Sequence, residues 1–349
     1  MSQFTFLTIK DIIRKTPSAV SLVFEIPTEK KEDFSFIAGQ FLTLKATIDN
    51  EEVRRAYSIS SQPNQEDIQI SVKKISDGKF STYANESLNI GDSIEVMIPE
   101  GKFQLHPNTN NTKDYMAFAA GSGITPIMSM IKTVLSLEND SKFVLIYGNK
   151  NSDETMFQEE LLTLRNNHPN RLFIEFVYSQ ENTEDSIFGR IEKSTVNFAI
   201  KNKYKSFSFK SFYLCGPEGM IETVTNVLCE NGISKEMIHH ELFTSSNINP
   251  TEGSNEGIAA VTVTVDDEEF KIETDKKVSL LEALLKNDID APYSCRGGVC
   301  CSCICRVTEG EADMPINNLL TDSEVAEGLI LACQSYAKSD TLKLNFDDA

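Results

Sequence analysis

Three features that would place a chain in a broad class of protein are missing from this sequence. No run of eighteen or more apolar residues occurs, so no segment reads as a membrane-spanning helix. Residues 1–10 have no basic region followed by an apolar core, the pattern of a secretory signal. Basic residues are in deficit, since 33 Lys and Arg stand against 52 Asp and Glu for a net charge of −19. The first two absences lead us to expect a cytoplasmic protein that does not bind membranes. Because Lys and Arg bind phosphate backbones, the deficit of basic residues argues against a nucleic-acid partner.

Internal repeats are also absent. A chain of 349 residues with 40% apolar content is long enough for two or three domains with their own cores. Residues 1–108 alternate apolar and polar positions in short runs, which predicts an antiparallel barrel or sandwich. Residues 113–243 alternate apolar strands with helical segments, which predicts a parallel α/β sheet with a ligand crevice at the carboxyl ends of its strands. Residues 244–257 are rich in Pro, Gly, Ser and Asn and predict a flexible linker. Residues 258–349 form a last, cysteine-rich module.

Six of the eight cysteines lie between residues 295 and 333. This crowding is a poor disulfide framework for so long a chain and suits thiolate ligands in a reducing compartment. Four residues and then two separate Cys295, Cys300 and Cys303, and Cys333 follows downstream, which is the plant-type 2Fe–2S spacing. We therefore predict these four as iron ligands and treat Cys301 and Cys305 as additional. The two-residue gap before Cys303 also occurs in zinc knuckles, so zinc is the alternative metal.

The flanks of this loop support the cluster. Residues 278–289 predict a helix that begins with a capping box of Ser279 and Glu282, and a second box pairs Thr321 with Glu324. Strands are expected at 261–265 and 342–346. The arrangement resembles plant-type ferredoxins, which implies an α+β (β-grasp) domain. Residues 258–349 hold 18 acidic and 8 basic residues, a surplus that serves solubility or steers a basic partner.

A short motif in the first region carries groups that suit a phosphate and a flat heterocycle. Arg55 offers a cation for phosphate, Tyr57 a ring for stacking on a flat heterocycle, and Ser58 a hydroxyl for a ring nitrogen. Further along, Gly78 precedes an expected helix whose first turn can offer amides to a pyrophosphate. Together these segments resemble the flavin domain of the ferredoxin–NADP reductase superfamily. The resemblance implies FAD, with FMN as the alternative, Arg55 on the pyrophosphate, Tyr57 against the isoalloxazine, Ser58 near N5, and further contacts from Ala56, Val72, Lys73, Gly78, Ser81 and Thr82.

Two turns mark the second region. The sequence Gly121-Ser122-Gly123 follows an apolar strand, and Thr125-Pro126 opens a helix, but the third glycine of the dinucleotide fingerprint is missing. A second turn, 215–217 (Cys-Gly-Pro), follows a later strand. The pair is similar to the pyridine-nucleotide domain of the same superfamily. That similarity implies that the glycine turn meets the cofactor's pyrophosphate and that Thr125 and Cys215 line the place where nicotinamide meets flavin, with Gly216 and Pro217 beside them.

Selection between NADPH and NADH is expected in the segment after the second strand. Lys150 and Ser152 could accept a 2′-phosphate, whereas Asp153 would disfavour one. These residues favour NADPH slightly.

In this order the three modules resemble the reductase components of bacterial oxygenases over essentially the whole chain. A nicotinamide gives up two electrons together and a 2Fe–2S centre accepts one, so a flavin between them is required. We therefore predict hydride transfer to the flavin next to Ser58, Thr125 and Cys215, followed by single-electron steps to the cluster and then to a separate oxygenase.

The identity of the oxygenase rests on resemblance. The Cys-Arg-Gly-Gly-Val-Cys loop at 295–300 and the Glu-Gly-Glu turn at 309–311 resemble the reductase component of phenylacetyl-CoA epoxidase, which implies a di-iron epoxidase complex as partner. Cys301, where glycine is more usual, and Cys305 depart from that family. The alternatives are a reductase for a Rieske-type ring hydroxylase and a redox sensor without turnover.

Overall fold

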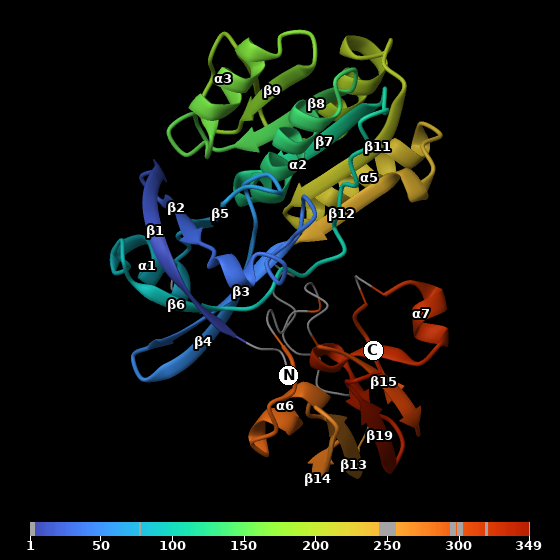
Figure 1. Ribbon diagram of the computed structural model, residues 1–349. Coiled ribbons are helices and arrows are strands. Elements are labelled where there is room, and N and C mark those ends of the chain that lie inside the picture. Colours follow the sequence, from blue (N-terminus) through green and yellow to red (C-terminus); the bar gives the residue numbers. More distant parts are fainter. Residues whose placement is uncertain are drawn as a thin grey trace. The chain divides into compact units, whose positions relative to one another are not determined.

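The chain divides into two compact units in a computed structural model, one of residues Phe4–Phe243 and one built on Thr244–Ala349 (Figure 1). The structure describes residues 4–76, 78–243, 256–293, 298, 303–317 and 320–348. The linker expected at 244–257 therefore lies almost entirely outside the described residues. Within the described residues no helix combines the length and the hydropathy needed to cross a membrane.

The first part of the larger unit is a six-stranded antiparallel sheet in the order β4-β3-β6-β1-β2-β5. A bridge between Ile59 and Ile70 joins its two outermost strands. This closure decides between the two architectures that the alternating sequence allowed, in favour of the barrel. The inward apolar side chains, among them Leu22, Phe24 and Leu44, form one core. The elements are β1 (Thr5–Thr16), β2 (Ala19–Glu25), β3 (Phe41–Ile48), β4 (Glu51–Ser58), β5 (Asp67–Lys73), α1 (Lys79–Glu86) and β6 (Ser93–Val96).

The second part is a six-stranded sheet in the order β10-β9-β8-β7-β11-β12, with every pair parallel. The chain starts at β7, builds outward to β10 and then returns to β11 on the other side of β7. A reversal of this kind opens a crevice at the carboxyl ends of the two central strands. The elements are β7 (Asp114–Ala120), α2 (Ile124–Leu137), β8 (Lys142–Asn149), α3 (Gln158–Asn167), β9 (Leu172–Tyr178), β10 (Ser186–Phe188), α4 (Lys193–Asn197), β11 (Phe209–Gly216), α5 (Glu218–Glu230) and β12 (Ile238–Leu242).

Helix α2 connects the two sheets. Eleven of its fourteen residues are buried, and its core cluster also contains Ala38, Phe103 and Leu105 of the barrel region. A helix that is apolar on nearly all sides is buried on nearly all sides, and α2 is buried between the parallel sheet and the barrel region. Its C-terminal end is capped by Arg171, which donates to the carbonyls of Val134 and Leu135 at 3.1 and 3.2 Å. The helix is therefore fixed at both faces and at one end.

The smaller unit is a mixed five-stranded sheet in the order β14-β13-β19-β15-β17, with β13 and β19 parallel. Its core gathers Val261, Leu284 and Leu344 with three cysteines. The strands at both ends of the module and the helix between them are as expected for a β-grasp ferredoxin domain. The elements are β13 (Ile258–Val265), β14 (Glu268–Asp275), α6 (Leu280–Lys286), β15 (Ile304–Glu309), β16 (Ala312–Asp313), α7 (Asp322–Ala326), β17 (Leu329–Leu331), β18 (Tyr336–Ala337) and β19 (Thr341–Asn345).

Helix boundaries in this unit follow the caps. Ser279 accepts a hydrogen bond from the Glu282 N–H at 3.3 Å, and the complete capping box of Thr321 and Glu324 is present. The prediction of a helix over 278–289 was too long, because α6 ends at Lys286. Asp288 has a φ of 57°, a left-handed conformation that stops a helix.

Candidate functional site

The end of strand β4 carries the residues predicted to bind flavin. Arg55 and Tyr57 share one face of the strand, and Ala56 and Ser58 share the other, as the alternation of a strand requires. The Tyr57 ring lies 5.5 Å from that of Phe80 on α1. Burial raises the pKa of Tyr57, against the smaller effect of the Arg55 charge, so the phenol is neutral. Arg55 is exposed and Ser58 is buried.

The segment between strand β5 and helix α1 is hydrogen-bonded to the first turn of α1. Ser81 Oγ accepts from the Ile75 N–H at 3.3 Å and donates to the Gly78 carbonyl at 3.1 Å. The Thr82 N–H already donates to Gly78 at 2.9 Å. The first three amides of a helix have no acceptor within the helix, so of the two residues predicted to offer an amide, Ser81 is the one placed to do so. Lys73 pairs with Glu154 of the neighbouring domain at 3.0 Å.

The glycine turn lies at the crevice of the parallel sheet. Gly123 is in contact with strand β11, since a Cβ placed on it would lie 2.1 Å from the Cys215 carbonyl oxygen. Gly121 has a φ of +55° and a Cβ there would meet nothing within 4 Å. Its carbonyl accepts from Tyr147 Oη at 3.0 Å, and Thr125 Oγ1 donates to the Ser122 carbonyl at 3.0 Å. The two turns predicted from sequence thus meet at the switch point, with open space in front of Gly121.

One residue of this region was not predicted as functional. Ser58 Oγ donates to Glu241 Oε2 at 3.3 Å, which joins the flavin strand to β12. Glu241 is also the register partner of Cys215 on β11. Both carboxylate and thiol are at least nine-tenths buried. Glu241 follows two histidines in β12 (Ile-His-His-Glu-Leu), so nothing in the local sequence marks it as a partner of Ser58.

Two of the four predicted cluster ligands are described, and Cys295 and Cys300 lie outside the described residues. Cys303 and Cys333 are both buried in the core of the small unit. The Ala332 N–H donates to the Cys303 carbonyl at 2.9 Å, which brings the two cysteine segments together. Cys305 is fully buried within β15, where its register partner is Ile330. That position, and a pKa that burial raises, describe a core thiol.

Comparisons with known proteins agree with this organisation. Residues 7–105 match the oxidoreductase FAD-binding domain, residues 118–226 the oxidoreductase NAD-binding domain, and residues 263–338 the 2Fe-2S iron-sulfur cluster binding domain. The chain is 35% identical to one of the subunits of 1,2-phenylacetyl-CoA epoxidase from Escherichia coli, over 99% of both chains. The ferredoxin reductase component of 3-ketosteroid-9-alpha-monooxygenase from Rhodococcus rhodochrous is 33% identical, over 99% of this chain and 97% of its own. The chain belongs to the oxygenase reductase family. The solved structure of phthalate dioxygenase reductase aligns with a TM-score of 0.61 and 25% identity over 98% of both chains.

The reductase is thus an oxidoreductase with FAD-, NAD- and 2Fe–2S-binding domains. The neutral Tyr57 ring, the exposed Arg55 and the α1 amides suit a flavin dinucleotide. The space in front of Gly121 suits a pyrophosphate. A set of buried thiols suits iron and sulfide. The roles of the individual residues stay predictions.

One contact in the structure weakens the predicted preference for NADPH. Ser152 donates from its N–H and from its Oγ to the Glu181 carboxylate, at 2.6 and 3.1 Å. Both donors of Ser152 are therefore used within the protein. Of the two residues thought to accept a 2′-phosphate, Lys150 is the more available, and the choice of nucleotide stays a prediction.

We expect Cys215 to resist iodoacetamide in the folded reductase, while the half-buried Cys229 is alkylated. Burial, and then the nearby Glu241 carboxylate, raise the pKa of Cys215 well above that of an ordinary thiol, and the thiolate is the reactive form. Mass spectrometry of peptides after timed labelling measures both sites. In urea the two cysteines should label at similar rates, and equal labelling in the folded protein would contradict the expectation.

Proposed function

We propose that this reductase takes electrons from NADH or NADPH and delivers them to a separate di-iron phenylacetyl-CoA epoxidase. The observation that supports this acceptor is the similarity to one polypeptide of the Escherichia coli epoxidase over 99% of both chains. FAD and a 2Fe–2S cluster are the redox groups of the domains matched. A bound flavin supplies the chemistry that side chains lack, the exchange of paired for single electrons.

The residues of the chain prepare the site for that exchange. Ser58 holds its hydroxyl proton toward Glu241 Oε2, which fixes the orientation of the hydroxyl at the end of β4. Cys215 remains a protonated, small side chain and does not act as a nucleophile. Thr125 fixes the glycine turn through the Ser122 carbonyl. These groups orient the nicotinamide and flavin rings. None of them is charged, and the Glu241 carboxylate, which accepts from Ser58, is the charged group beside them.

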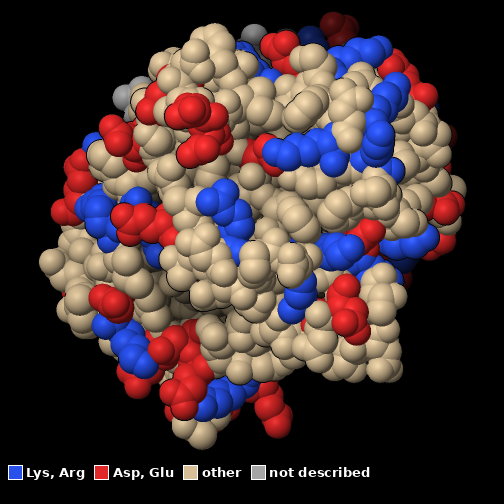
Figure 2. All heavy atoms as spheres, turned by 90° about the horizontal axis from the view of Figure 1, so that it is seen from above, with Lys and Arg blue, Asp and Glu red and all other residues tan. Residues whose placement is uncertain are grey.

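The charge balance argues against a nucleic-acid partner. Figure 2 shows a face that carries both basic and acidic groups, with several Lys and Arg groups close together toward its upper right. A chain with a net charge of −19 would be repelled by phosphate backbones.

A Rieske-type hydroxylase is the second candidate acceptor. The 33% identity to the reductase component of a ketosteroid monooxygenase, again over nearly the whole chain, favours it. Both acceptors take single electrons, so the reductase domains alone do not discriminate between them.

A reconstituted assay distinguishes the two. We expect phenylacetyl-CoA to be oxidised, with about one nicotinamide consumed per product, when the reductase is mixed with the other components of the epoxidase. Reduction of ferricyanide serves as the control that the reductase is active in each mixture. Normal ferricyanide reduction without phenylacetyl-CoA oxidation, together with coupling to a Rieske-type oxygenase, would overturn the proposal in favour of the second acceptor.

A further inference from the structure

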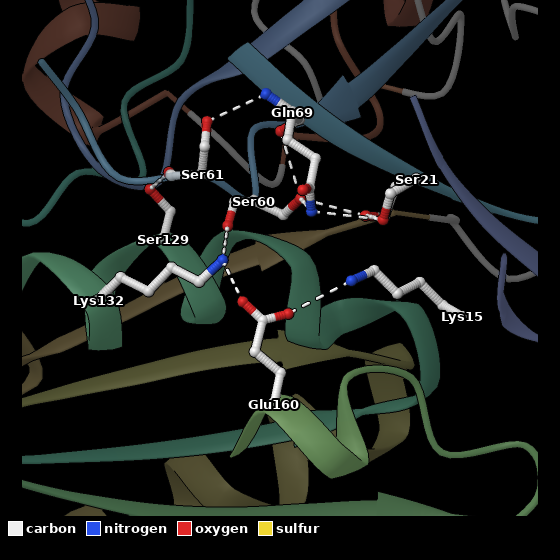
Figure 3. Close-up of polar contacts among 9 residues, drawn as sticks. Lys15, Ser21, Ser60, Ser61, Gln69, Ser129, Lys132 and Glu160 are labelled. Atoms are coloured by element: carbon white, nitrogen blue, oxygen red, sulfur yellow. Dashed lines mark hydrogen bonds and ion pairs between the residues drawn. The ribbon is translucent and has the colours of Figure 1, made fainter. Parts of the chain in front are cut away.

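Helix α2 is hydrogen-bonded to the segment that follows the predicted flavin strand β4 (Figure 3). Ser129 Oγ donates to the Ser61 carbonyl at 2.6 Å, and Lys132 Nζ donates to the Ser60 carbonyl at 3.2 Å. Ser60 and Ser61 follow β4 within three residues of Ser58. On the helix, Ser129 lies one turn after Thr125. The attachment therefore joins the segment that ends β4 to the helix that begins at the glycine turn.

A single carboxylate supports this attachment from α3. Glu160 Oε1 lies 2.6 Å from Lys132 Nζ, and Glu160 Oε2 lies 3.3 Å from Lys15 Nζ on barrel strand β1 (Figure 3). The two lysine side chains are only 17% and 14% exposed. Burial acts to raise the pKa of Glu160, but the two lysines outweigh it and lower the pKa, so the group is charged. Loss of this carboxylate would leave two sheltered cations without their shared counter-ion.

The barrel side of the attachment is itself rigid. Ser60 Oγ lies 3.1 Å from Ser71 Oγ, which lies 2.7 Å from Ser21 Oγ. The Gln69 side-chain amide donates to the hydroxyls of Ser21 and Ser60, and the Gln69 backbone N–H donates to Ser61 Oγ at 3.0 Å. A buried polar network whose members are all hydrogen-bonded holds one geometry. A displacement of Ser60 and Ser61 would therefore also move the hydrogen-bonded strands β2 and β5.

We propose that Glu160, acting through Lys132, is a positioning residue that sets the approach of the nicotinamide ring to the flavin. Four helical residues from Thr125 to Ser129 span about 6 Å, and three extended residues from Ser58 to Ser61 span about 10 Å. The attachment is thus close to both sides of the predicted reacting site. Since a displacement of about 1 Å can lower a rate about a hundredfold, a small change in tilt of α2 is enough to matter. This inference rests on the FAD and NAD domains, and it is independent of which oxygenase accepts the electrons.

A second polar contact, made by Glu154, also joins the two domains and does not depend on Glu160. Glu154 accepts from Ser18 Oγ at 2.6 Å and pairs with Lys73 at 3.0 Å, and neither contact involves Glu160 or Lys132. Removal of the Glu160 charge therefore changes the geometry without separating the domains. Glu159, exposed and adjacent on α3, provides the matched control.

The test compares Glu160→Gln, Glu159→Gln and Lys132→Arg in the full-length holoprotein. For Glu160→Gln we expect flavin reduction at saturating nucleotide to slow at least tenfold, with less than a twofold change in KM and an unchanged Kd for ADP-ribose, which lacks nicotinamide. The long-wavelength absorbance that arises when nicotinamide stacks on flavin should weaken in parallel. Lys132→Arg keeps the charge pair and should retain most of the rate and the absorbance, and Glu159→Gln should match the wild type.

A merely structural ion pair predicts a different pattern. Thermal unfolding would shift in Glu160→Gln while the stacking absorbance and the rate of flavin reduction stayed at the values of Glu159→Gln. That result would overturn the positioning role. If ferricyanide reduction and the stacking absorbance behave as expected but phenylacetyl-CoA is not oxidised, the positioning role stands and the proposed acceptor fails.

Discussion

Replacement of Cys333 by serine is expected to remove the 2Fe–2S cluster and to leave the flavin in place. A serine oxygen is a poor substitute for a thiolate at a site built for sulfur ligands. Cys333 lies with Cys303 in the core of the small unit, whereas the predicted flavin residues lie in the larger unit. Iron content should fall to near zero, the flavin absorbance should remain, and reduction of ferricyanide by the flavin should continue.

The matched control is Cys305→Ala. Cys305 is fully buried in β15 opposite Ile330, so alanine removes a core sulfur at a cost of about 1–2 kcal/mol and leaves the iron bound. Iron analysis and visible absorbance of both variants decide the assignment. If Cys305→Ala lost its iron while Cys333→Ser kept it, the ligand set predicted from spacing would be wrong.

Replacement of Gly123 by alanine is expected to damage the nucleotide domain severely. The new Cβ would lie 2.1 Å from the Cys215 carbonyl oxygen and 2.5 Å from its carbon, and neither backbone atom can turn aside as a side chain would. The turn or strand β11 must therefore move. We expect a loss of roughly 3 kcal/mol or more in the free energy of unfolding, and at least a tenfold weaker binding of NAD(P)H, because both turns of the crevice shift.

Gly219→Ala is the control for this variant. Gly219 lies in the first turn of α5, where a Cβ would meet nothing within 4 Å. Alanine is the better helix former, so stability should be unchanged or higher by up to about 1 kcal/mol. Flavin release during urea titration and equilibrium binding of NADH and NADPH compare the two variants. Equal behaviour would mean that the close approach of Gly123 to β11 is not required.

Local patterns predicted the elements that carry the site. The alternation predicted within residues 1–108 corresponds to strands such as β5, Thr125-Pro126 lies in the first turn of α2, and Ser279 caps α6. These features depend on neighbours within a few residues, so a sequence shows them directly. The end of α6 was harder, since the left-handed conformation at Asp288 is one that aspartate only sometimes adopts.

Residues that act across domains could not be predicted. Glu160 on a half-exposed helix and Glu241 at a strand end look like ordinary surface acids in the sequence, and Ser60 like a turn residue. Lys15 lies 145 positions from Glu160, Lys132 lies 72 positions from Ser60, and Glu241 lies 183 positions from Ser58. No periodicity spans such separations.

The sequence by itself determined the kind of protein, because the cysteine spacing, the Arg-Ala-Tyr-Ser strand and the two glycine turns are local patterns, and their occurrence together in one order is typical of an oxygenase reductase. Only the tertiary structure decided that the barrel closes, that Gly123 touches β11, and that one carboxylate of α3 holds lysines of two domains. Those facts are distances between segments far apart in the chain, and they are fixed by packing that no single segment contains.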